Sequence, residues 1–335
     1  MSRDPFEGLS DEARTALRKR KVPDWTQPML ARLTHDHFSD PDWIFERKLD
    51  GERMLAFRNG SSVRLMSRNK KELNDTYPEI VEALEKEKES RFVLDGEVVA
   101  FEGDVTSFER LQNRMKITDP DEARASDVAV YYYVFDVLHL ADYDTTRLAL
   151  RDRKRLLRGA LDLDSSRIRL TSHRNEQGLQ YYEEACRSGW EGIIAKDATS
   201  TYVHSRSSRW LKFKCSNQQE FVIAGFTDPK GSRVGFGALL IGYYDEDADL
   251  RYAGKVGTGY DDETLRELRD RMEDLERSDP PFVDEKLPHK GVHWLEPKLV
   301  GEFGYTELTR ENRLRHPRFL GLRRDKSPTK VRLER

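Results

Sequence analysis

The stretch at residues 46–53 (ERKLDGER) holds residue types whose spacing suits covalent chemistry on a phosphate. Lys48 is followed two residues later by Asp50-Gly51, and apolar runs lie on both sides, at 43–45 and 54–57. Both runs predict strands, so Lys48 would lie where a turn meets a sheet, among charged groups. A lysine can act as a nucleophile where burial and neighbouring cations lower its pKa. A plain hairpin with a solvated lysine is the alternative, because Asp-Gly is a common turn dipeptide.

Five further clusters along the chain carry acids, lysines, arginines and aromatic rings. They are 94–99 (LDGEVV), 133–136 (YVFD), 191–196 (EGIIAK), the stretch that holds Arg206, Trp210, Lys212 and Lys214, and 323–326 (RRDK). Strand alternation places Lys212 and Lys214 on one face. Each cluster taken singly also has a plain structural interpretation: an acid paired with an arginine, a core ring, or an exposed strand face.

The elements that must position the first clusters are short strands and helices. Asn59-Gly60 is a strong hairpin signal and joins strands at 54–58 and 63–67. Further strands are expected at 92–101 and 128–138. Helices are expected from residue 73 onward through Leu84, and at 106–116, 146–161 and 176–187.

The second half of the chain changes character after residue 216. Three strand-like runs (221–226, 238–244 and 250–256) precede an amphipathic helix at 261–277 and two strands, at 293–307 and 319–323. This order matches the five-stranded OB barrel, which binds nucleic acids, although other small barrels share it. The predicted fold class is α+β, with a lead segment at 1–24, a first domain at 25–216 and a barrel domain at 217–335.

Composition restricts the classes of function. The net charge of the 335 residues is only −3, which excludes a global attraction to polyanions. Residues 310–335 nevertheless contain ten Arg or Lys and three acids, a basic region suited to phosphates or simply a solvated face. Two cysteines, Cys186 and Cys215, cannot form a four-cysteine zinc site and do not predict a disulfide scaffold. No signal-peptide or membrane-spanning stretch is present, so we expect a soluble cytoplasmic protein associated with the nucleoid.

The six clusters, in this order and spacing, resemble the nucleotidyltransferase motifs of ATP-dependent DNA ligases. The resemblance covers about residues 25–330 and is strongest for the ligase domain of bacterial non-homologous end-joining ligases, including the run at 314–319 (LRHPRF). It implies an adenylation domain with antiparallel sheets, followed by an OB-fold domain.

The resemblance also implies a three-step reaction. Lys48 would attack the α-phosphate of ATP to give lysyl-AMP and pyrophosphate. AMP would then pass to the 5′-phosphate at a nick, and the 3′-hydroxyl would displace AMP and seal the strand. Because charge spreads over phosphate oxygens in each step, cations should supply most of the stabilisation.

Motif positions assign roles around the nucleotide. Glu46 would lie near the adenine amine, Phe135 would stack under the base, and Ile193 or Ile194 would cover its other face. Arg68 is also a candidate for holding the 5′-phosphate of the nick. The residues that would contact ribose or phosphates are Arg53, Arg68, Glu97, Arg206, Lys212 and Lys214.

The metal and pyrophosphate sites follow from the same resemblance. Glu191, with Asp50 or Glu97, would bind Mg²⁺ or Mn²⁺, since hard cations prefer carboxylate and phosphate oxygens. The residues that would reach from the barrel domain to orient pyrophosphate are Arg323, Asp325 and Lys326.

The expected partner is nicked or broken double-stranded DNA, together with end-joining repair proteins, and a monomer is expected. The motifs begin within about fifty residues of the start, so we expect none of the extra DNA-binding, zinc or BRCT modules of larger ligases, and no appended polymerase or nuclease domains. The two domains themselves would then have to hold the DNA.

Two alternatives remain. An RNA ligase or a capping guanylyltransferase shares the lysine chemistry and the OB domain, and would differ by its use of RNA nicks or GTP. A nucleic-acid-binding OB protein with an inactive nucleotide pocket belongs to a different class. It would not need Lys48, Glu97, Glu191, Lys212 and Arg323 together.

Overall fold

The structure is a computed structural model that describes residues 4–162, 167–215, 217–229, 231, 233–284 and 286–334. The chain forms two units. The first unit is Met1–Cys215 and the second is Ser216–Arg335, a division that lies next to the boundary predicted at residue 216. Phe6 and Leu9 pack in a core of the first unit, so the lead segment belongs to that unit. No helix in the described parts of the chain is long and apolar enough to cross a membrane.

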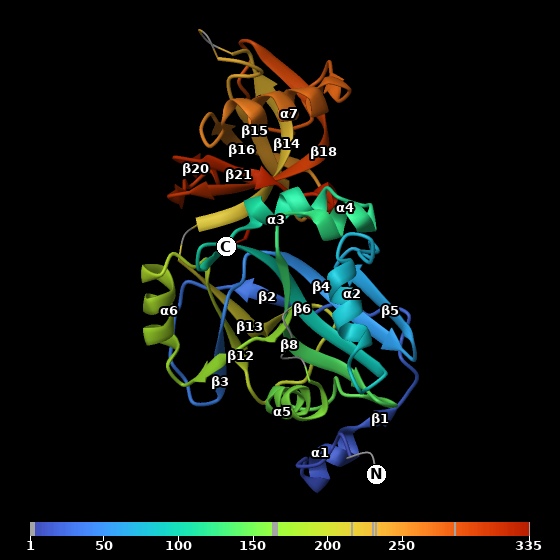
Figure 1. The fold of residues 1–335 in the computed structure, drawn as a ribbon. Helices are drawn as coiled ribbons and strands as arrows, with labels where there is room; N and C mark the ends of the chain where they lie inside the picture. The colour runs from blue at the N-terminus through green and yellow to red at the C-terminus, as the bar shows by residue number, and fades with distance from the viewer. Residues whose placement is uncertain are drawn as a thin grey trace. The chain divides into compact units, whose positions relative to one another are not determined.

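The larger sheet of the first unit has the strand order β1-β9-β8-β6-β4-β5, with β10 added on β8 and β7 on β6 (Figure 1). Its pairs are antiparallel except β10–β8, which is parallel. Gly60 has φ +67° in the turn from β4 to β5, which confirms the hairpin. The bounds are β1 Arg18–Lys19, β4 Glu52–Asn59, β5 Ser62–Ser67, β6 Arg91–Glu102, β7 Val105–Thr106, β8 Val130–Leu140, β9 Tyr143–Asp144 and β10 Ile168–Leu170.

The second sheet of this unit has the order β11-β3-β12-β13-β2. The β13–β2 pair is parallel and the others are antiparallel. The bounds are β2 Leu30–Leu33, β3 Trp43–Arg47, β11 His173–Asn175, β12 Gly192–Asp197 and β13 Arg206–Lys214.

Helices cover the outer faces of the two sheets, and the inner faces meet. The larger sheet packs against α2, α3 and α5, and the second sheet packs against α6. Figure 1 shows α2 across the sheet near β5, and α6 beside β3 and β12. Between the sheets, Leu55, Phe57 and Phe135 of the larger sheet share a core with Trp210 of the second. The helix bounds are α1 Asp11–Ala16, α2 Pro78–Glu85, α3 Phe108–Met115, α4 Pro120–Ala125, α5 Leu150–Ala160 and α6 Gly178–Arg187.

Over its described residues, the second unit is an antiparallel sheet with one α-helix, α7. The strand order is β16-β15-β14-β18-β17, and β21 pairs with β18. Leu265, Leu268 and Met272 of α7 are buried in its core. This confirms the predicted order of main strands and helix. The bounds are β14 Asn217–Thr227, β15 Leu239–Tyr244, β16 Leu250–Val256, α7 Asp262–Glu273, β17 Glu276–Arg277, β18 Val292–Tyr305, β19 Glu307–Leu308, β20 Leu314–Arg315, β21 Arg318–Leu322 and the 3₁₀ helix Pro328–Lys330.

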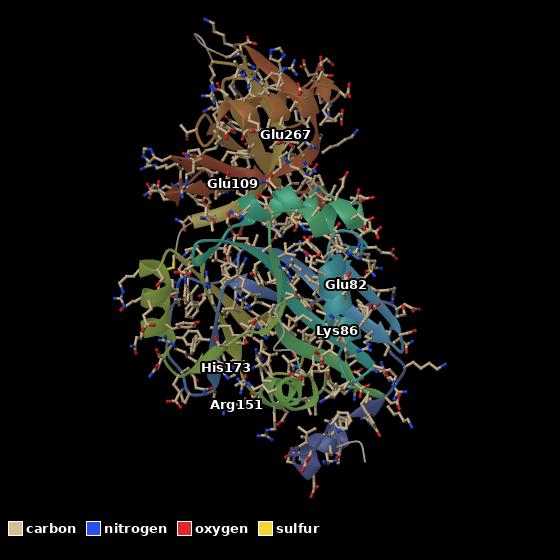
Figure 2. All side chains as sticks on the ribbon, in the orientation of Figure 1. Glu82, Lys86, Glu109, Arg151, His173 and Glu267 are labelled. Atoms are coloured by element: carbon tan, nitrogen blue, oxygen red, sulfur yellow. A yellow bond between two sulfur atoms is a disulfide. The ribbon has the colours of Figure 1, made fainter. Side chains whose placement is uncertain are left out.

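Three helix boundaries differ from prediction by four residues or more. The helix expected from 146 begins at Leu150, and at the other two boundaries another pairing competes for the backbone. The helix expected from residue 73 begins at Pro78, because the Asn74 side chain bonds the edge of β5, at Leu65 N (2.7 Å) and Val63 O (2.8 Å). The helix expected to end at 277 ends at Glu273, since Glu276–Arg277 pairs with β18 as strand β17. Charged side chains project from the helices, as Figure 2 shows for Glu82 on α2 and Glu109 on α3.

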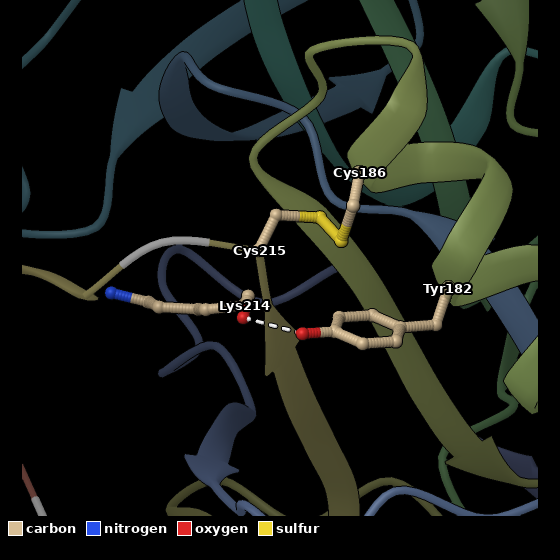
Figure 3. The surroundings of a disulfide bond; sticks show 4 residues. All are labelled: Tyr182, Cys186, Lys214 and Cys215. Atoms are coloured by element: carbon tan, nitrogen blue, oxygen red, sulfur yellow. Dashed lines mark hydrogen bonds between the residues drawn. A yellow bond between two sulfur atoms is a disulfide. The ribbon is translucent and has the colours of Figure 1, made fainter.

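The two cysteines form a disulfide, which the sequence analysis did not predict. Cys186 lies in α6 and Cys215 follows β13, and the bond closes a separation of 29 residues (Figure 3). Beside it, the Tyr182 hydroxyl donates to the carbonyl oxygen of Lys214 at 3.1 Å. The pairing depends on α6 packing against the second sheet, a tertiary contact that cysteine count alone cannot supply.

Candidate active site

The candidate nucleophile lies at the end of β3. The Lys48 amide donates to Gly192 O at 2.9 Å, which fixes its backbone beside β12. Its ammonium forms an ion pair with the Glu191 carboxylate, and both side chains are mostly buried. Burial opposes ionisation of Glu191, but the nearby Lys48, Lys214 and Lys212 ammonium groups lower the pKa of that carboxyl below its ordinary value. Lys48 is thus held against the Glu191 carboxylate at a site that is mostly shielded from solvent.

The strand register gathers several predicted residues on one face of the second sheet. Ile194 of β12 lies opposite Glu46 of β3 and Lys212 of β13, and Gly192 lies opposite Lys214. Because cross-strand partners share a face, these side chains lie on the same side of the sheet. Gly192 has φ +144°, and a Cβ there would lie 2.0 Å from the carbonyl oxygen of Phe213. Glycine at position 192 therefore allows β12 to pack closely against β13, directly beside Lys48.

Ile193 is a correction to the predicted site. Its side chain is fully buried with Phe45, Phe213 and Tyr181 in the core under α6. Alternation along β12 turns Ile193 away from the face that holds Lys212, so it cannot cover a base there. Ile194 is the residue of this pair on the predicted nucleotide side.

Glu46 is held by two lysines that the sequence analysis did not select. Its buried carboxylate forms ion pairs with Lys154 of α5 and Lys196 of β12, the latter at 2.6 Å. Burial opposes ionisation, but the two ammonium groups lower the pKa of Glu46 below its ordinary value. Burial also lowers the pKa of Lys196 to about 8. Alternation from Ile194 to Lys196 could have indicated the second lysine, whereas nothing in the sequence pairs Lys154 with Glu46.

Phe135 lies between cationic groups at the meeting of the two sheets. The Arg53 guanidinium carbon is 4.4 Å from the ring centroid, and the Lys196 ammonium is 4.2 Å away. The Trp210 ring meets Phe135 edge-on, at 6.1 Å between centroids. Only 7% of Phe135 is exposed. Stacking of a base on this ring therefore stays a prediction, and it requires one of these neighbours to move or share the ring.

Arg53 is paired through both of its fork nitrogens. Its Nε and Nη2 donate to the two oxygens of Asp95, each at 2.6 Å, and the Tyr202 hydroxyl donates to the same carboxylate at 2.6 Å. Burial opposes the charge on Arg53, but Asp95 raises the pKa of the guanidinium above its ordinary value. Glu97 is the cross-strand partner of Arg53. The structure therefore places Arg53 and Glu97 on one face of the larger sheet, and their contacts with ribose or phosphate stay predictions.

Asp50, Arg68 and Arg206 lie at the margins of the site. The Asp50 carboxylate accepts the amide of Phe108 at 3.3 Å, at the start of α3. Arg68 directly follows β5, and Arg206 begins β13 and donates to Ala31 O at 2.7 Å. Within the described residues, no group of three or more His, Cys, Asp or Glu side chains is placed to hold a metal ion. The proposed metal roles of Glu191, Glu97 and Asp50 and the phosphate roles of Arg68 and Arg206 stay predictions.

The terminal motif forms its own ion-pair network within the second unit. Arg323 donates to both oxygens of Asp325, each at 2.9 Å, and to Glu302 at 3.2 Å. Burial opposes the charge on Arg323, but Asp325 raises the pKa of the guanidinium above its ordinary value. Burial likewise opposes the charge on Asp325, but Arg323 lowers the pKa of that carboxyl below its ordinary value. Lys326 pairs with Glu220 at 2.6 Å. Their predicted role at pyrophosphate stays a prediction.

Family models match most of the chain. The model "ATP dependent DNA ligase domain" matches residues 28–214, and "ATP dependent DNA ligase C terminal region" matches residues 232–326. The fold and the lysine site thus define a covalent nucleotidyltransferase, an adenylation domain followed by an OB-fold domain. The chain belongs to the ATP-dependent DNA ligase family.

Individual relatives agree with this assignment. The chain is 35% identical over 325 residues to the multifunctional non-homologous end joining protein LigD of Pseudomonas aeruginosa, covering 95% of this chain and 38% of that protein. It is 33% identical over 295 residues to a DNA ligase of Natronomonas pharaonis, covering 85% of this chain and 52% of that protein. The chain therefore spans well under two thirds of these relatives.

A solved structure shows the same fold. A mycobacterial DNA ligase D complexed with ATP and MES matches with a TM-score of 0.63 and 32% identity, over 92% of this chain and 98% of that one. The predicted fold class, an α+β adenylation domain followed by an OB-fold domain, is confirmed.

Proposed function

We propose that this chain joins 5′-phosphate and 3′-hydroxyl ends of nicked or broken DNA through lysyl-AMP and DNA-adenylate intermediates. The observation that carries the proposal is Lys48, held against the Glu191 carboxylate, with the Lys214 and Lys212 ammonium groups near enough to act on that carboxylate. A nucleophilic lysine needs a group that takes up its proton and cations that neutralise the phosphates it approaches. Lys212 is suited to the second task, and Glu191, whose pKa is lowered, holds the Lys48 side chain in place as a carboxylate.

ATP is the proposed adenylate donor. Glu46 offers carboxylate oxygens that can accept a hydrogen bond from the amine of adenine, and its ion pairs with Lys154 and Lys196 keep it ionised. Guanine carries a carbonyl oxygen at the corresponding ring position and would face a negative charge. This difference favours ATP over GTP and weighs against a capping guanylyltransferase.

Mg²⁺, or Mn²⁺ in its place, is the proposed metal. Glu191 and Glu97 are hard oxygen donors on the site side of the two sheets, and the pKa of Glu191 is already lowered, so it is available as a carboxylate. Two carboxylates do not complete an octahedral shell, so phosphates and water would supply the remaining ligands. When bound, the ion would neutralise charge on the phosphates.

Double-stranded DNA with a nick or break is the proposed substrate, and DNA repair by end joining is the proposed setting. This rests on the similarity to LigD and on the OB-fold domain, a fold that binds nucleic acids. Repair proteins of the same pathway are the proposed partners, the chain is proposed to act as a monomer, and association with the nucleoid follows from the substrate.

The experiment that tests the proposal is sealing of a singly nicked duplex with a labelled 5′-phosphate. The wild-type chain should seal the DNA nick with ATP and Mg²⁺, and should do so poorly with GTP or when the nicked strand is RNA. Lys48→Ala should lose sealing completely, because no other residue can replace the nucleophile. Efficient sealing only of RNA would favour the RNA ligase alternative, and labelling only by GTP would favour the capping enzyme. A folded wild-type chain without any nucleotide transfer would overturn the proposal.

A further inference from the structure

A row of arginines and aromatic rings lies beside the lysine site and has no role in the proposed nucleotide chemistry. We define the arginine–aromatic seam as Arg47, Phe101, Tyr131, Tyr133, Arg169 and Trp190. Arg47 directly precedes Lys48, and Trp190 directly precedes Glu191. Tyr133 is the cross-strand partner of both Glu97 and Arg169, so the seam runs from β3 over β6 and β8 to β10.

Each end of the seam holds a stacked guanidinium. Arg47 lies 4.3 Å from the Trp190 ring and 6.0 Å from the Phe101 ring. Arg169 lies 4.3 Å from the Tyr131 ring and donates to the Tyr133 hydroxyl at 3.0 Å.

Phe101 links the two ends. Its ring centroid is 5.7 Å from that of Tyr131 and 6.1 Å from that of Tyr133. Stacking on a ring holds a guanidinium flat while its N–H edge remains able to bind a phosphate through two hydrogen bonds.

The two seam arginines differ from those arginines of this unit that pair with carboxylates, such as Arg53, Arg153 and Arg174. Among the described residues, neither Arg47 nor Arg169 forms an ion pair with a carboxylate. Their hydrogen bonds go to neutral oxygens, at 3.3 Å to the backbone carbonyl of Asp104 and 3.0 Å to the Tyr133 hydroxyl. The Nε of Arg47 is buried and has no hydrogen-bond partner in the described part of the chain. Both guanidinium groups therefore lack a carboxylate bonded directly to them among the described residues, although the charge of Asp104 acts on Arg47 from nearby.

Arg174 is the matched contrast. It also stacks on a tyrosine, with its guanidinium 4.4 Å from the Tyr181 ring, but it pairs with Glu184 at 2.6 Å. An arginine that stacks on a ring can therefore also pair with a carboxylate. The difference between Arg174 and the seam indicates that Arg47 and Arg169 are kept available for an anion from outside the chain.

We propose that the arginine–aromatic seam binds the sugar–phosphate backbone of the DNA strand that continues from the reacting 5′-phosphate at Lys48. The inference deepens the proposed ligase function and rests on it. DNA is the occupant we propose, because two guanidinium groups beside the lysine site complement the negative charge of a phosphate backbone. Backbone contacts of this kind position the strand and carry no base specificity.

The test is binding of nicked DNA with an unreactive dideoxy 3′-end, followed by fluorescence anisotropy over a series of salt concentrations. Each phosphate contact contributes about 0.9 to the slope of log affinity against log salt. Arg47→Met and Arg169→Met should each lower the slope by about 0.9 and weaken binding about eightfold at 0.1 M salt, and the double variant should lose both contributions. Arg47→Lys and Arg169→Lys should keep the slope, because the charge is kept. Arg174→Met should keep both slope and affinity.

A second measurement uses the wild-type chain and so does not depend on the folding of any variant. Modification of arginines by phenylglyoxal, read by peptide mass spectrometry, should be slowed at Arg47 and Arg169 by nicked DNA and unchanged at Arg174. An unchanged slope in the folded double methionine variant, or no protection of either arginine by bound DNA, would overturn the inference. The proposed function would fail separately, by absence of AMP transfer or of nicked-DNA binding in the wild-type chain.

Discussion

The two units bury charged groups in different ways. In the first unit, Glu46 is paired with Lys154 and Lys196, which come from a helix and another strand more than a hundred residues further along the chain. In the second unit, Arg323 pairs mainly with Asp325, two residues away. The first network exists only when β3, β12 and α5 are assembled, whereas much of the second forms within one short segment. Damage to the first should therefore spread further.

Glu46→Ala should produce the largest loss of stability, because it leaves two buried ammonium groups without their carboxylate. Removing one partner of a buried ion pair costs about 3–5 kcal/mol. Asp325→Ala is the comparison in the second unit and should cost less, since Glu302 still pairs with Arg323 at 3.2 Å. Hydrogen exchange, which reports each unit separately, measures both. Equal losses in the two units would contradict the contrast.

Removal of the disulfide should give the next largest loss of stability. It sharpens the same contrast, because both cysteines belong to the first unit. Cys186→Ser with Cys215→Ser should lower the free energy of unfolding of the first unit by about 3–4 kcal/mol, the scale for a loop near 29 residues. The wild-type chain under reducing conditions serves as the chemical control and should behave like the double variant. Protection in the second unit should not change. A double variant as stable as the oxidised wild type would show that the bond does not constrain the chain.

Arg323→Ala tests whether the local network of the second unit serves one chemical step. Self-adenylation should slow by about 10²-fold, the scale for loss of one donor to a transition state. Sealing of a nick that already carries AMP should change far less, since pyrophosphate is absent from that step. Arg324 could partly substitute, so the double variant Arg323→Ala, Arg324→Ala is measured beside it. Equal losses in both rates would contradict a step-specific role.

Phe135→Leu should have the smallest effect and separates binding from packing. If adenine stacks on the ring, ATP binding should weaken by about 1–3 kcal/mol. Phe57→Leu is the matched control, because Phe57 lies in the same core between the sheets but has Arg64 over its ring, at 5.5 Å, in place of Arg53 and Lys196. Calorimetric titration with ATP and thermal unfolding of both variants give the comparison. Reduced thermal stability with unchanged ATP affinity in Phe135→Leu would assign the ring to the core.

The sequence predicted the order of strands and helices well because most of them follow from local patterns. The hairpin at Asn59-Gly60 and the alternation that aligns Lys212 with Lys214 depend on neighbours in the chain, and both are present. Alternation also distinguishes Ile194 from Ile193 once β12 is known to be buried on both faces. The burial of Ile193 under α6 depends on tertiary packing, so the sequence alone could not decide which of the two residues faces the nucleotide.

Partners from distant segments could not be predicted. Lys154 reaches Glu46 only because α5 packs on the larger sheet while β3 belongs to the second. Cys186 and Cys215 meet only because α6 packs beside β13. The stacking of Arg47 on Trp190 depends equally on the arrangement of β3 and the start of β12. In each case the residue types were visible, but the pairing was set by how the sheets and helices assemble.

The central claim is that Lys48 carries AMP as a covalent intermediate, and peptide mass spectrometry of the chain after incubation with ATP and Mg²⁺ tests it most directly. The account predicts an intact mass increased by one AMP, with the added mass on the peptide that contains Lys48 and removed by nicked DNA. Lys48→Arg keeps the charge beside Glu191 and serves as the matched control, which should remain unlabelled while folded. AMP found on another residue, or labelling that persists in folded Lys48→Arg, would contradict the account.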